Sequence, residues 1–262
     1  MNSKSRTRRS SPQPKANDSR RARLAILIAG TAWLLGCSHA DPLQPPPPPR
    51  PSPPPQGDST AVLTAAKDNT LYETALGELS NGAGEYFFVG RTGSGRLRRG
   101  LIGFDIAAGL PSGATVTSVS LTFHMSRTIV GPESIAVHNV LAEWGESTSN
   151  SNVLGGGGGA PSAPGDATWI HTFFDTSLWV SPGGDFSTAS SAAEPVDTVG
   201  FYNWSTPQMA ADVQAWLDDP SKNFGWILIG PENMTSTKRF DTRENTTGMF
   251  RPRLTVRYKP AP

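Results

Sequence analysis

Cysteine is almost absent from this 262-residue chain, in which Cys37 is the only one. A disulfide within the chain is therefore excluded, and so is a CxxC metal-binding or redox motif. The folded part must be stabilised by its hydrophobic core alone. A domain of roughly 200 residues is large enough to bury such a core.

Histidine is also scarce, and familiar catalytic motifs are missing. The four histidines are His39, His124, His138 and His171. They show no metal-ligand spacing, and the HExxH and GxSxG patterns are absent. Residues 90–100 are rich in glycine but fail the GxGxxG spacing. We therefore expect a protein that is not an enzyme. A polysaccharide hydrolase or lyase is the alternative, with Glu143 and Glu146 as a candidate carboxylate pair.

The sequence has no apolar run of the roughly 20 residues that cross a bilayer comfortably. Its run Leu24–Leu35 has twelve residues and follows a segment, Met1–Arg23, with eight basic residues and one acid. This order predicts an export signal peptide over residues 1–36. A short membrane anchor is the alternative.

The end of this apolar run, Leu34-Leu35-Gly36-Cys37, resembles a bacterial lipobox. The resemblance implies cleavage before Cys37 and acylation of its thiol, which would anchor the mature chain to a membrane. Ser38 is compatible with the outer membrane. We therefore expect an exported, lipid-anchored protein at the outer membrane or the cell surface.

Residues 37–60 are expected to form a lipidated, proline-rich linker. They contain PLQPPPPPRPSPPPQ, which favours extended polyproline II and would act as a semi-rigid spacer. Without residues 1–36 the chain keeps 15 basic and 21 acidic residues, a net charge of −6. This balance excludes the overall basic field of nucleic-acid-binding proteins, so any anion binding must be local.

Residues 61–259 show the patterns of a β-domain. Alternation is clearest over 116–125, where Val119, Leu121, Phe123 and Met125 share one face. Further strands are expected at 62–66, 70–72, 85–89, 99–106, 134–142, 224–229, 238–243 and 253–257. Turn residues separate these runs. The sequence therefore predicts an all-β fold, an antiparallel β-sandwich.

Two segments depart from the strand pattern. Thr206 is a plausible N-cap, Pro207 suits a first helical position and Pro220 ends the segment, which predicts one short helix. Residues 145–166 contain five consecutive glycines and little apolar surface. We expect this segment to be a mobile loop.

Two sets of side chains are candidate ligand-binding residues. The basic set is Arg98, Arg99, Lys238, Arg239 and Arg243, and the aromatic set is Trp144, Trp169 and Trp179. Arginine pairs with carboxylates in a bidentate manner, and indole faces offer flat apolar area to sugar rings. In the alternative, the arginines pair with acids of the domain, such as Glu244, and the tryptophans cover the core. The sequence leaves both interpretations open.

Oxygen-bearing side chains also allow a structural Ca²⁺ site. Asp68, Asn69 and Glu73 are close in sequence and offer the ligands that Ca²⁺ prefers. An EF-hand pattern is absent, and roles in turns or at strand edges are the alternative. No other cofactor is expected.

Several short motifs follow one another in order over residues 61–259. They include NGAG (81–84), RGLIGFD (99–105), GDATW (165–169), DVQAWL (212–217) and RPRL (251–254). Their order resembles the DNRLRE domain family, although FDTRE (240–244) matches only the Arg-Glu end of the namesake string. The resemblance implies a β-sandwich of jelly-roll type. Some relatives are alginate-binding modules of carbohydrate-binding family 96, in which basic side chains contact uronate carboxylates.

The resemblance and the local basic side chains together predict a non-catalytic surface lipoprotein that binds polysaccharide, with an acidic polysaccharide as one option. A structural or adhesive envelope protein with a protein partner is the alternative. The charge balance predicts that nucleic acid is not a partner.

Overall fold

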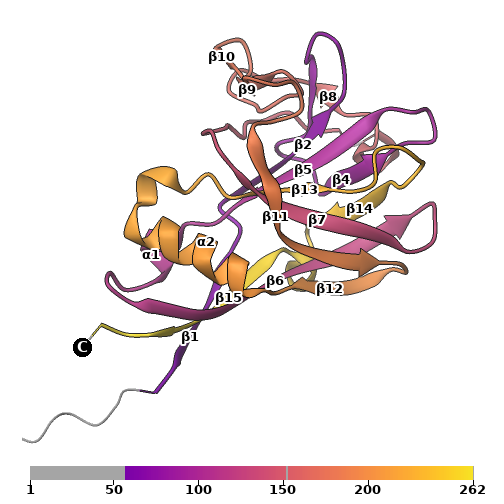
Figure 1. Ribbon diagram of the computed structural model, residues 1–262. Helices are drawn as coiled ribbons and strands as arrows, with labels where there is room; N and C mark the ends of the chain where they lie inside the picture. Colours follow the sequence, from indigo (N-terminus) through magenta and orange to yellow (C-terminus); the bar gives the residue numbers. More distant parts are fainter. Residues whose placement is uncertain (1–56, 152, 262) are drawn as a thin grey trace, which may run out of the picture. The chain divides into compact units, whose positions relative to one another are not determined.

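A computed structural model describes residues 57–151 and 153–261, which form a curled antiparallel sheet with few helices (Figure 1). The prediction of a mostly β, antiparallel fold is confirmed. The expected signal peptide, Cys37 and nearly all of the proline-rich linker lie outside the described residues. None of the described helices is long and apolar enough to cross a bilayer.

The predicted strands all form, with bounds that shift by a few residues. They are β1 (Ser59–Thr64), β2 (Lys67–Tyr72), β4 (Tyr86–Arg91), β5 (Leu97–Gly103), β6 (Thr115–Thr128), β7 (Glu133–Val140), β13 (Trp226–Ile229), β14 (Lys238–Asp241) and β15 (Arg253–Lys259). In β6 the side chains of Val119, Leu121, Phe123 and Met125 are buried, as the alternation predicts.

Two longer strands, β11 and β12, are missing from the sequence prediction. They are β11 (Phe186–Val196) and β12 (Gly200–Trp204). Strand β11 reads FSTASSAAEPV and has few of the β-branched and aromatic residues that favour strands. Shorter elements complete the chain: β3 (Leu79–Ser80), α1 (Ile106–Gly109), η1 (Val153–Gly156), β8 (Ala160–Pro161), β9 (His171–Phe173), β10 (Ser177–Leu178), η2 (Pro220–Lys222) and η3 (Gly248–Phe250).

The main sheet curls over on itself and encloses the core. Its order is β1-β15-β6-β14-β4-β5-β13-β7-β11, with β12 also paired to β6 and β2 also paired to β5. Strand β4 pairs with β14 and, at its end, with β5, so it connects the two layers. One core cluster contains Phe87, Phe123 and Phe240 from one layer and Ile102 and Val137 from the other. The two layers therefore share a single hydrophobic core.

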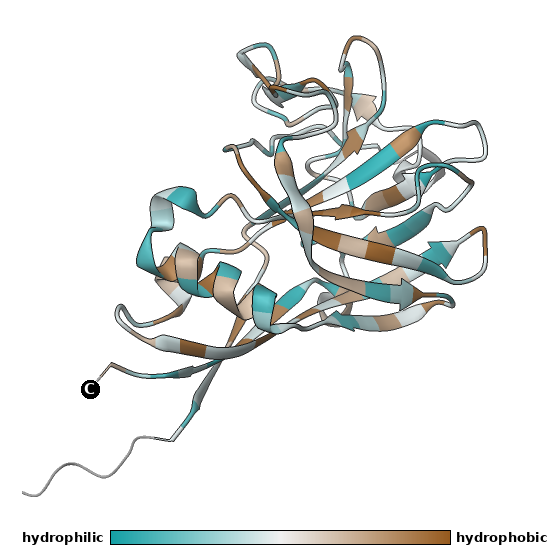
Figure 2. Ribbon diagram, in the orientation of Figure 1, coloured by the Kyte–Doolittle hydropathy of each residue, from teal (hydrophilic) through white to brown (hydrophobic). Residues whose placement is uncertain are grey.

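Helix α2 (Pro207–Asp218) packs against one end of the curled sheet (Figure 1). The Thr206 hydroxyl accepts a hydrogen bond from the Met209 amide at 3.1 Å, which confirms the predicted N-cap. Figure 2 shows that the helix carries both hydrophobic and hydrophilic residues along its length. Met209, Val213 and Trp216 are buried in the core shared by the layers. The predicted helix is therefore confirmed.

A second core lies on the outer side of β2, β5 and β13. The strands contribute Leu71, Leu101 and Ile227, and the connection between β7 and β11 contributes three tryptophans. The complete buried cluster is Leu71, Leu101, Val140, Trp144, Ala167, Trp169, Trp179 and Ile227. The long connection therefore acts as a cover for this part of the sheet.

The described residues of the glycine-rich segment, 145–151 and 153–166, belong to this cover, and hydrogen bonds connect them to it. The Asp166 carboxylate accepts hydrogen bonds from the amides of Ser147 (2.7 Å) and Ala163 (2.8 Å), which closes the segment on itself. The buried Tyr72 hydroxyl donates to the Gly156 carbonyl at 2.7 Å. Strand β8 pairs with β3. Hydrogen bonds replace the apolar contacts that the sequence lacks there.

Candidate functional site

The three candidate tryptophans lie inside the second core. Trp144, Trp169 and Trp179 are at most 9% exposed. The indole nitrogen of Trp144 donates to the Phe224 carbonyl at 2.7 Å, and that of Trp179 donates to the Thr168 carbonyl at 2.9 Å. The protein itself covers these rings. The prediction that they offer flat faces to a sugar is therefore wrong, and the alternative of core packing holds.

Lys238 is also inside the protein. Its side chain is 0% exposed. The ammonium group donates to the Thr128 hydroxyl at 2.8 Å and to the carbonyls of Val130 (3.1 Å) and Gly131 (2.5 Å). Burial lowers the pKa of Lys238. These three hydrogen bonds use all three ammonium hydrogens and link β14 to the turn after β6. Lys238 therefore has no donor left for a ligand.

Arg98 and Arg99 are engaged within the domain as well. The Nε and Nη2 atoms of Arg99 donate to the two carboxylate oxygens of Glu232, at 2.7 and 2.9 Å, in a bidentate pair. The buried Arg98 guanidinium lies 4.7 Å from the ring centre of Tyr72 and donates to the Leu97 carbonyl. These two arginines therefore have structural roles, and the predicted basic set does not converge on one face.

Arg239 is the member of the basic set that lines a pocket. The outward faces of β4, β6 and β14 place it beside Tyr86 and Ser126. Its guanidinium lies 3.9 Å from the ring centre of Tyr86, and its Nε donates to the Ser126 hydroxyl at 3.0 Å. Arg127 lies opposite Arg239 in the pairing of β6 with β14. Burial lowers the pKa of Arg239, and the charge of Arg127 acts in the same direction.

Two adjoining pockets flank the Arg239 side chain. The basic pocket, of about 120 Å³, is lined by Phe88, Arg127, Thr128, Ile129, Gly155, Gly157, Thr237 and Arg239. The aromatic pocket, of about 180 Å³, is lined by Glu85, Tyr86, His124, Ser126, Asp241, Asn245, Thr246, Thr247 and Phe250. Arg239 belongs to the first and contacts two residues that line the second. We call the two together the outer-face site.

The aromatic pocket contains an imidazole held in a fixed orientation. The Nδ1 atom of His124 lies 2.5 Å from a carboxylate oxygen of Asp241. Its ring stacks on Phe250, with centroids 4.0 Å apart, and also contacts Phe201. Phe201 is 43% exposed. Burial raises the pKa of Asp241, whereas the hydrogen bond from His124 lowers it. Sequence reasoning assigns no role to these aromatic residues because they come from three distant segments.

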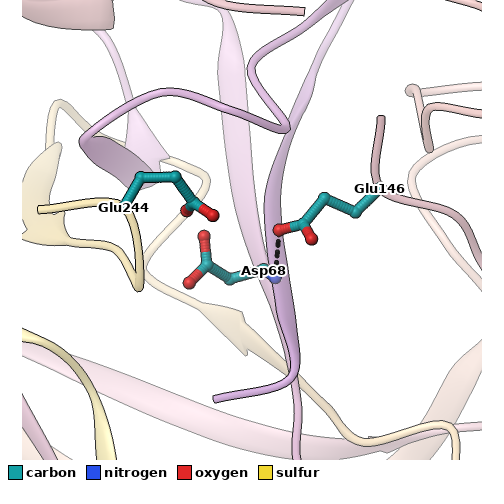
Figure 3. Close-up of side chains that lie close together, drawn as sticks. All are labelled: Asp68, Glu146 and Glu244. Carbon is teal, nitrogen blue, oxygen red and sulfur yellow. Dashed lines mark hydrogen bonds between the residues drawn. The ribbon is translucent and has the colours of Figure 1, made fainter. Parts of the chain in front are cut away.

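Two of the remaining candidates, Arg243 and Asp68, belong to a group built around three carboxylates, which Figure 3 shows. Asp68, Glu146 and Glu244 each offer an oxygen, and these oxygens lie within 4.8 Å of one another. Arg243 donates to Glu146 from Nη2 at 2.7 Å and from Nε at 3.1 Å, and its Nε also lies 2.9 Å from a carboxylate oxygen of Glu244. Arg243 is therefore occupied by these acids. We call Asp68, Glu146 and Glu244 the carboxylate cluster.

The burial of the carboxylate cluster disfavours three negative charges. Burial raises the pKa of Asp68 well above its ordinary value, and the charges of Glu244 and Glu146 add to the effect. Burial and the charge of Glu146 raise the pKa of Glu244 to about 7. Burial also raises the pKa of Glu146, against the hydrogen bond from Arg243. Such a cluster can hold a proton or a cation.

The other residues predicted for Ca²⁺ do not join this cluster. The Asn69 amide bonds the Ser80 hydroxyl at 2.9 Å, and Glu73 accepts a hydrogen bond from the Leu97 amide at 2.7 Å. Asp68 is therefore the one member of that predicted set in the carboxylate cluster. The other two members of the cluster, Glu146 and Glu244, lie 78 and 176 positions after Asp68 in the chain.

No family model matches the chain, and no curated protein is significantly similar to it.

Proposed function

We propose that the protein is a non-catalytic surface lipoprotein whose β-domain binds a carboxylate-bearing polysaccharide at the outer-face site. The main support is the placement of Arg127 and Arg239. They lie opposite each other and line the same pocket. Within residues 57–151 and 153–261, neither arginine has a carboxylate at ion-pair distance.

Two like charges directly across a strand pair repel each other. An anionic ligand between Arg127 and Arg239 relieves that repulsion, because a guanidinium binds a carboxylate through two parallel hydrogen bonds. Uronate residues in a polysaccharide present such carboxylates at regular intervals. The net charge of −6 outside residues 1–36 makes the attraction local to this pocket.

The adjoining aromatic pocket suits a neighbouring sugar unit. Phe250 and Tyr86 supply apolar surface, while Asp241, Asn245 and His124 supply hydrogen-bonding groups. Small-molecule sites combine apolar walls with a few polar groups in this manner. Two pockets on either side of Arg239 suit neighbouring units of a sugar chain better than one isolated monosaccharide.

Sequence features support the cellular setting of this proposal. The export signal, the lipobox-like segment ending at Cys37 and the proline-rich linker suit a domain displayed away from a membrane. The resemblance to the DNRLRE family supports a jelly-roll arrangement of the curled sheet. It also supports recognition of uronates by basic side chains.

Binding of the full-length protein to immobilised glycans tests the proposal. The array includes polyuronates such as alginate and pectin, neutral polysaccharides, and a sulfated polysaccharide. We expect binding to polyuronates. Arg239→Ala should weaken it about 10- to 100-fold, because a hydrogen bond to a charged group contributes about 1.5–3 kcal/mol.

Arg257→Ala is the matched control, since Arg257 is an exposed arginine on β15 away from both pockets. Its affinity should stay within about twofold of wild type, as is usual for surface substitutions. Binding to none of the glycans would refute the function. Equal binding by wild type and Arg239→Ala would refute the site.

A further inference from the structure

We propose that the carboxylate cluster of Asp68, Glu146 and Glu244 is a binding site for one divalent cation, with Ca²⁺ as the preferred ion. The three residues come from β2, from the connection between β7 and β11, and from the segment after β14. A bound ion would therefore tie together three segments that are distant in sequence. This proposal is independent of polysaccharide binding.

The first observation is an unpartnered buried oxygen that points into the cluster. Asp68 is 0% exposed, and its Oδ1 has no hydrogen-bond partner within the described residues. Its other oxygen accepts a hydrogen bond from the Arg243 amide at 2.8 Å. The Oε2 of Glu244 is likewise buried and unpartnered. Figure 3 shows the carboxylates of Asp68 and Glu244 directed toward each other.

Buried carboxylate oxygens without partners are costly, so each calls for a proton or a cation. Apolar neighbours could not satisfy these oxygens, because the oxygens are charged hydrogen-bond acceptors, and they lie beside other acceptors. A hydrogen-bond donor from the chain would satisfy them, yet the nearest guanidinium, Arg243, already donates to Glu146 and forms an ion pair with the other oxygen of Glu244.

The charge balance of the cluster matches a divalent ion. Three carboxylates face one guanidinium, that of Arg243. Lys67 contributes a weaker attraction to Glu146, but its ammonium is bonded to Glu143 and to the Trp144 carbonyl. About two negative charges therefore remain. A divalent cation neutralises both, whereas one shared proton neutralises only one.

The irregular ligand set of the cluster favours Ca²⁺ over Mg²⁺. The cluster's oxygens lie within 4.8 Å of one another, an upper limit that is compatible with an ion of either size. Mg²⁺ requires octahedral geometry with bonds of about 2.1 Å and gives up water reluctantly. Ca²⁺ tolerates irregular sites with six to eight oxygens, of which water can supply the rest.

Direct titration of the full-length protein tests the proposal. Protein stripped with EDTA and exchanged into chelator-free buffer is titrated with CaCl₂ by calorimetry and, separately, with MgCl₂. We expect one Ca²⁺ per chain and weaker binding of Mg²⁺. At a Ca²⁺ concentration 100 times the Kd, Tm should rise by about 5 to 10 °C.

Asp68→Asn and Glu244→Gln should each reduce Ca²⁺ affinity at least tenfold and lower the rise in Tm at that Ca²⁺ concentration to about half of the wild-type rise or less. Glu143→Gln is the matched control, since Glu143 lies in the same connection but outside the cluster. It should retain wild-type affinity.

A wild-type protein that binds no Ca²⁺, or that binds it without a change in Tm, would overturn the proposal. Equal affinity in wild type and Asp68→Asn would also overturn it. Circular dichroism of each metal-free variant verifies folding. If both variants fail to fold, the stoichiometry and Tm response of the wild-type protein decide the matter alone.

Discussion

Replacing Asp68 by Asn should stabilise the metal-free protein and weaken its response to Ca²⁺. In the metal-free protein three carboxylates face each other with Arg243 as their direct counter-ion. Asparagine keeps an oxygen that can accept the Arg243 amide hydrogen. Its NH₂ group can donate to the unpartnered oxygen of Glu244. The substitution therefore removes repulsion and leaves no new unpaired group, so it should stabilise the metal-free protein.

The size of the effect follows from the spacing of the charges. Two unit charges 4.8 Å apart, the upper limit for this cluster, repel by about 3.5 kcal/mol at an effective dielectric constant near 20. The lost attraction between Asp68 and Arg243 offsets part of this repulsion. A net gain of about 1 to 3 kcal/mol remains. For a domain of about 200 residues, Tm should rise by about 2 to 10 °C.

Ca²⁺ should reduce the advantage of Asp68→Asn over wild type. At 100 times the wild-type Kd it stabilises wild type by about 2.7 kcal/mol, whereas a variant with tenfold weaker affinity gains about 1.4 kcal/mol. The assay is thermal unfolding followed by circular dichroism at pH 8, in EDTA and in CaCl₂. If Asp68→Asn is less stable than wild type in EDTA, the carboxylates do not repel as described and the reasoning fails.

Lowering the pH should stabilise the metal-free protein, as Asp68→Asn does. The folded-state pKa of Glu244, about 7, lies above its ordinary value, and that of Asp68 is also raised. The folded state therefore binds protons more tightly than the unfolded chain, and stability should rise as pH falls from 8 toward 5. The advantage of Asp68→Asn should shrink over that range. Urea midpoints in EDTA at pH 8, 6.5 and 5 measure the trend, and a difference that is constant with pH would contradict it.

Two further predictions concern the core and the backbone. The Trp226 indole donates to the buried Asp212 carboxylate at 2.9 Å, so Trp226→Phe should cost about 1.5–3 kcal/mol in urea unfolding; an unchanged midpoint would show that this bond contributes nothing. A Cβ at Gly225 (φ 76°) would lie 2.1 Å from the Ile102 carbonyl oxygen, so Gly225→Ala should cost about 4 kcal/mol or more. Gly113 has a similar φ of 75° and nothing closer than 3.4 Å, so Gly113→Ala should cost only about 1–2 kcal/mol, and equal losses would contradict the steric argument.

The sequence predicts the local structure of this protein well. The alternation over β6 and the capping residues Thr206 and Pro207 give both the element type and its bounds within a few residues. These signals work because each depends on neighbours within one turn or one strand. Strand β11 escapes prediction because its small polar residues form a strand through pairing with β7, at positions about 50 residues away.

The candidate site is predicted less well, because it depends on contacts between distant residues. Arg99 looks available in sequence, but its partner Glu232 lies 133 positions away. Burial of Trp144 likewise becomes visible only when the connection after β7 covers the sheet. Within the basic set, Arg239 lines a pocket and has no carboxylate at ion-pair distance among the described residues. Spacing along the chain cannot distinguish these cases.

The pairing of the first described strand with the last has a consequence for biosynthesis. Ser59 in β1 lies opposite Tyr258 in β15, and β15 lies between β1 and β6. Until the ribosome has made β15, β1 has no neighbour in the sheet and one edge of β6 is largely bare. We therefore expect the sheet of the nascent chain to remain incomplete until β15 has been made, because long-range strand pairing must wait for both partners. If the domain is exported as we propose, that delay keeps the chain unfolded while it is threaded through a secretion channel.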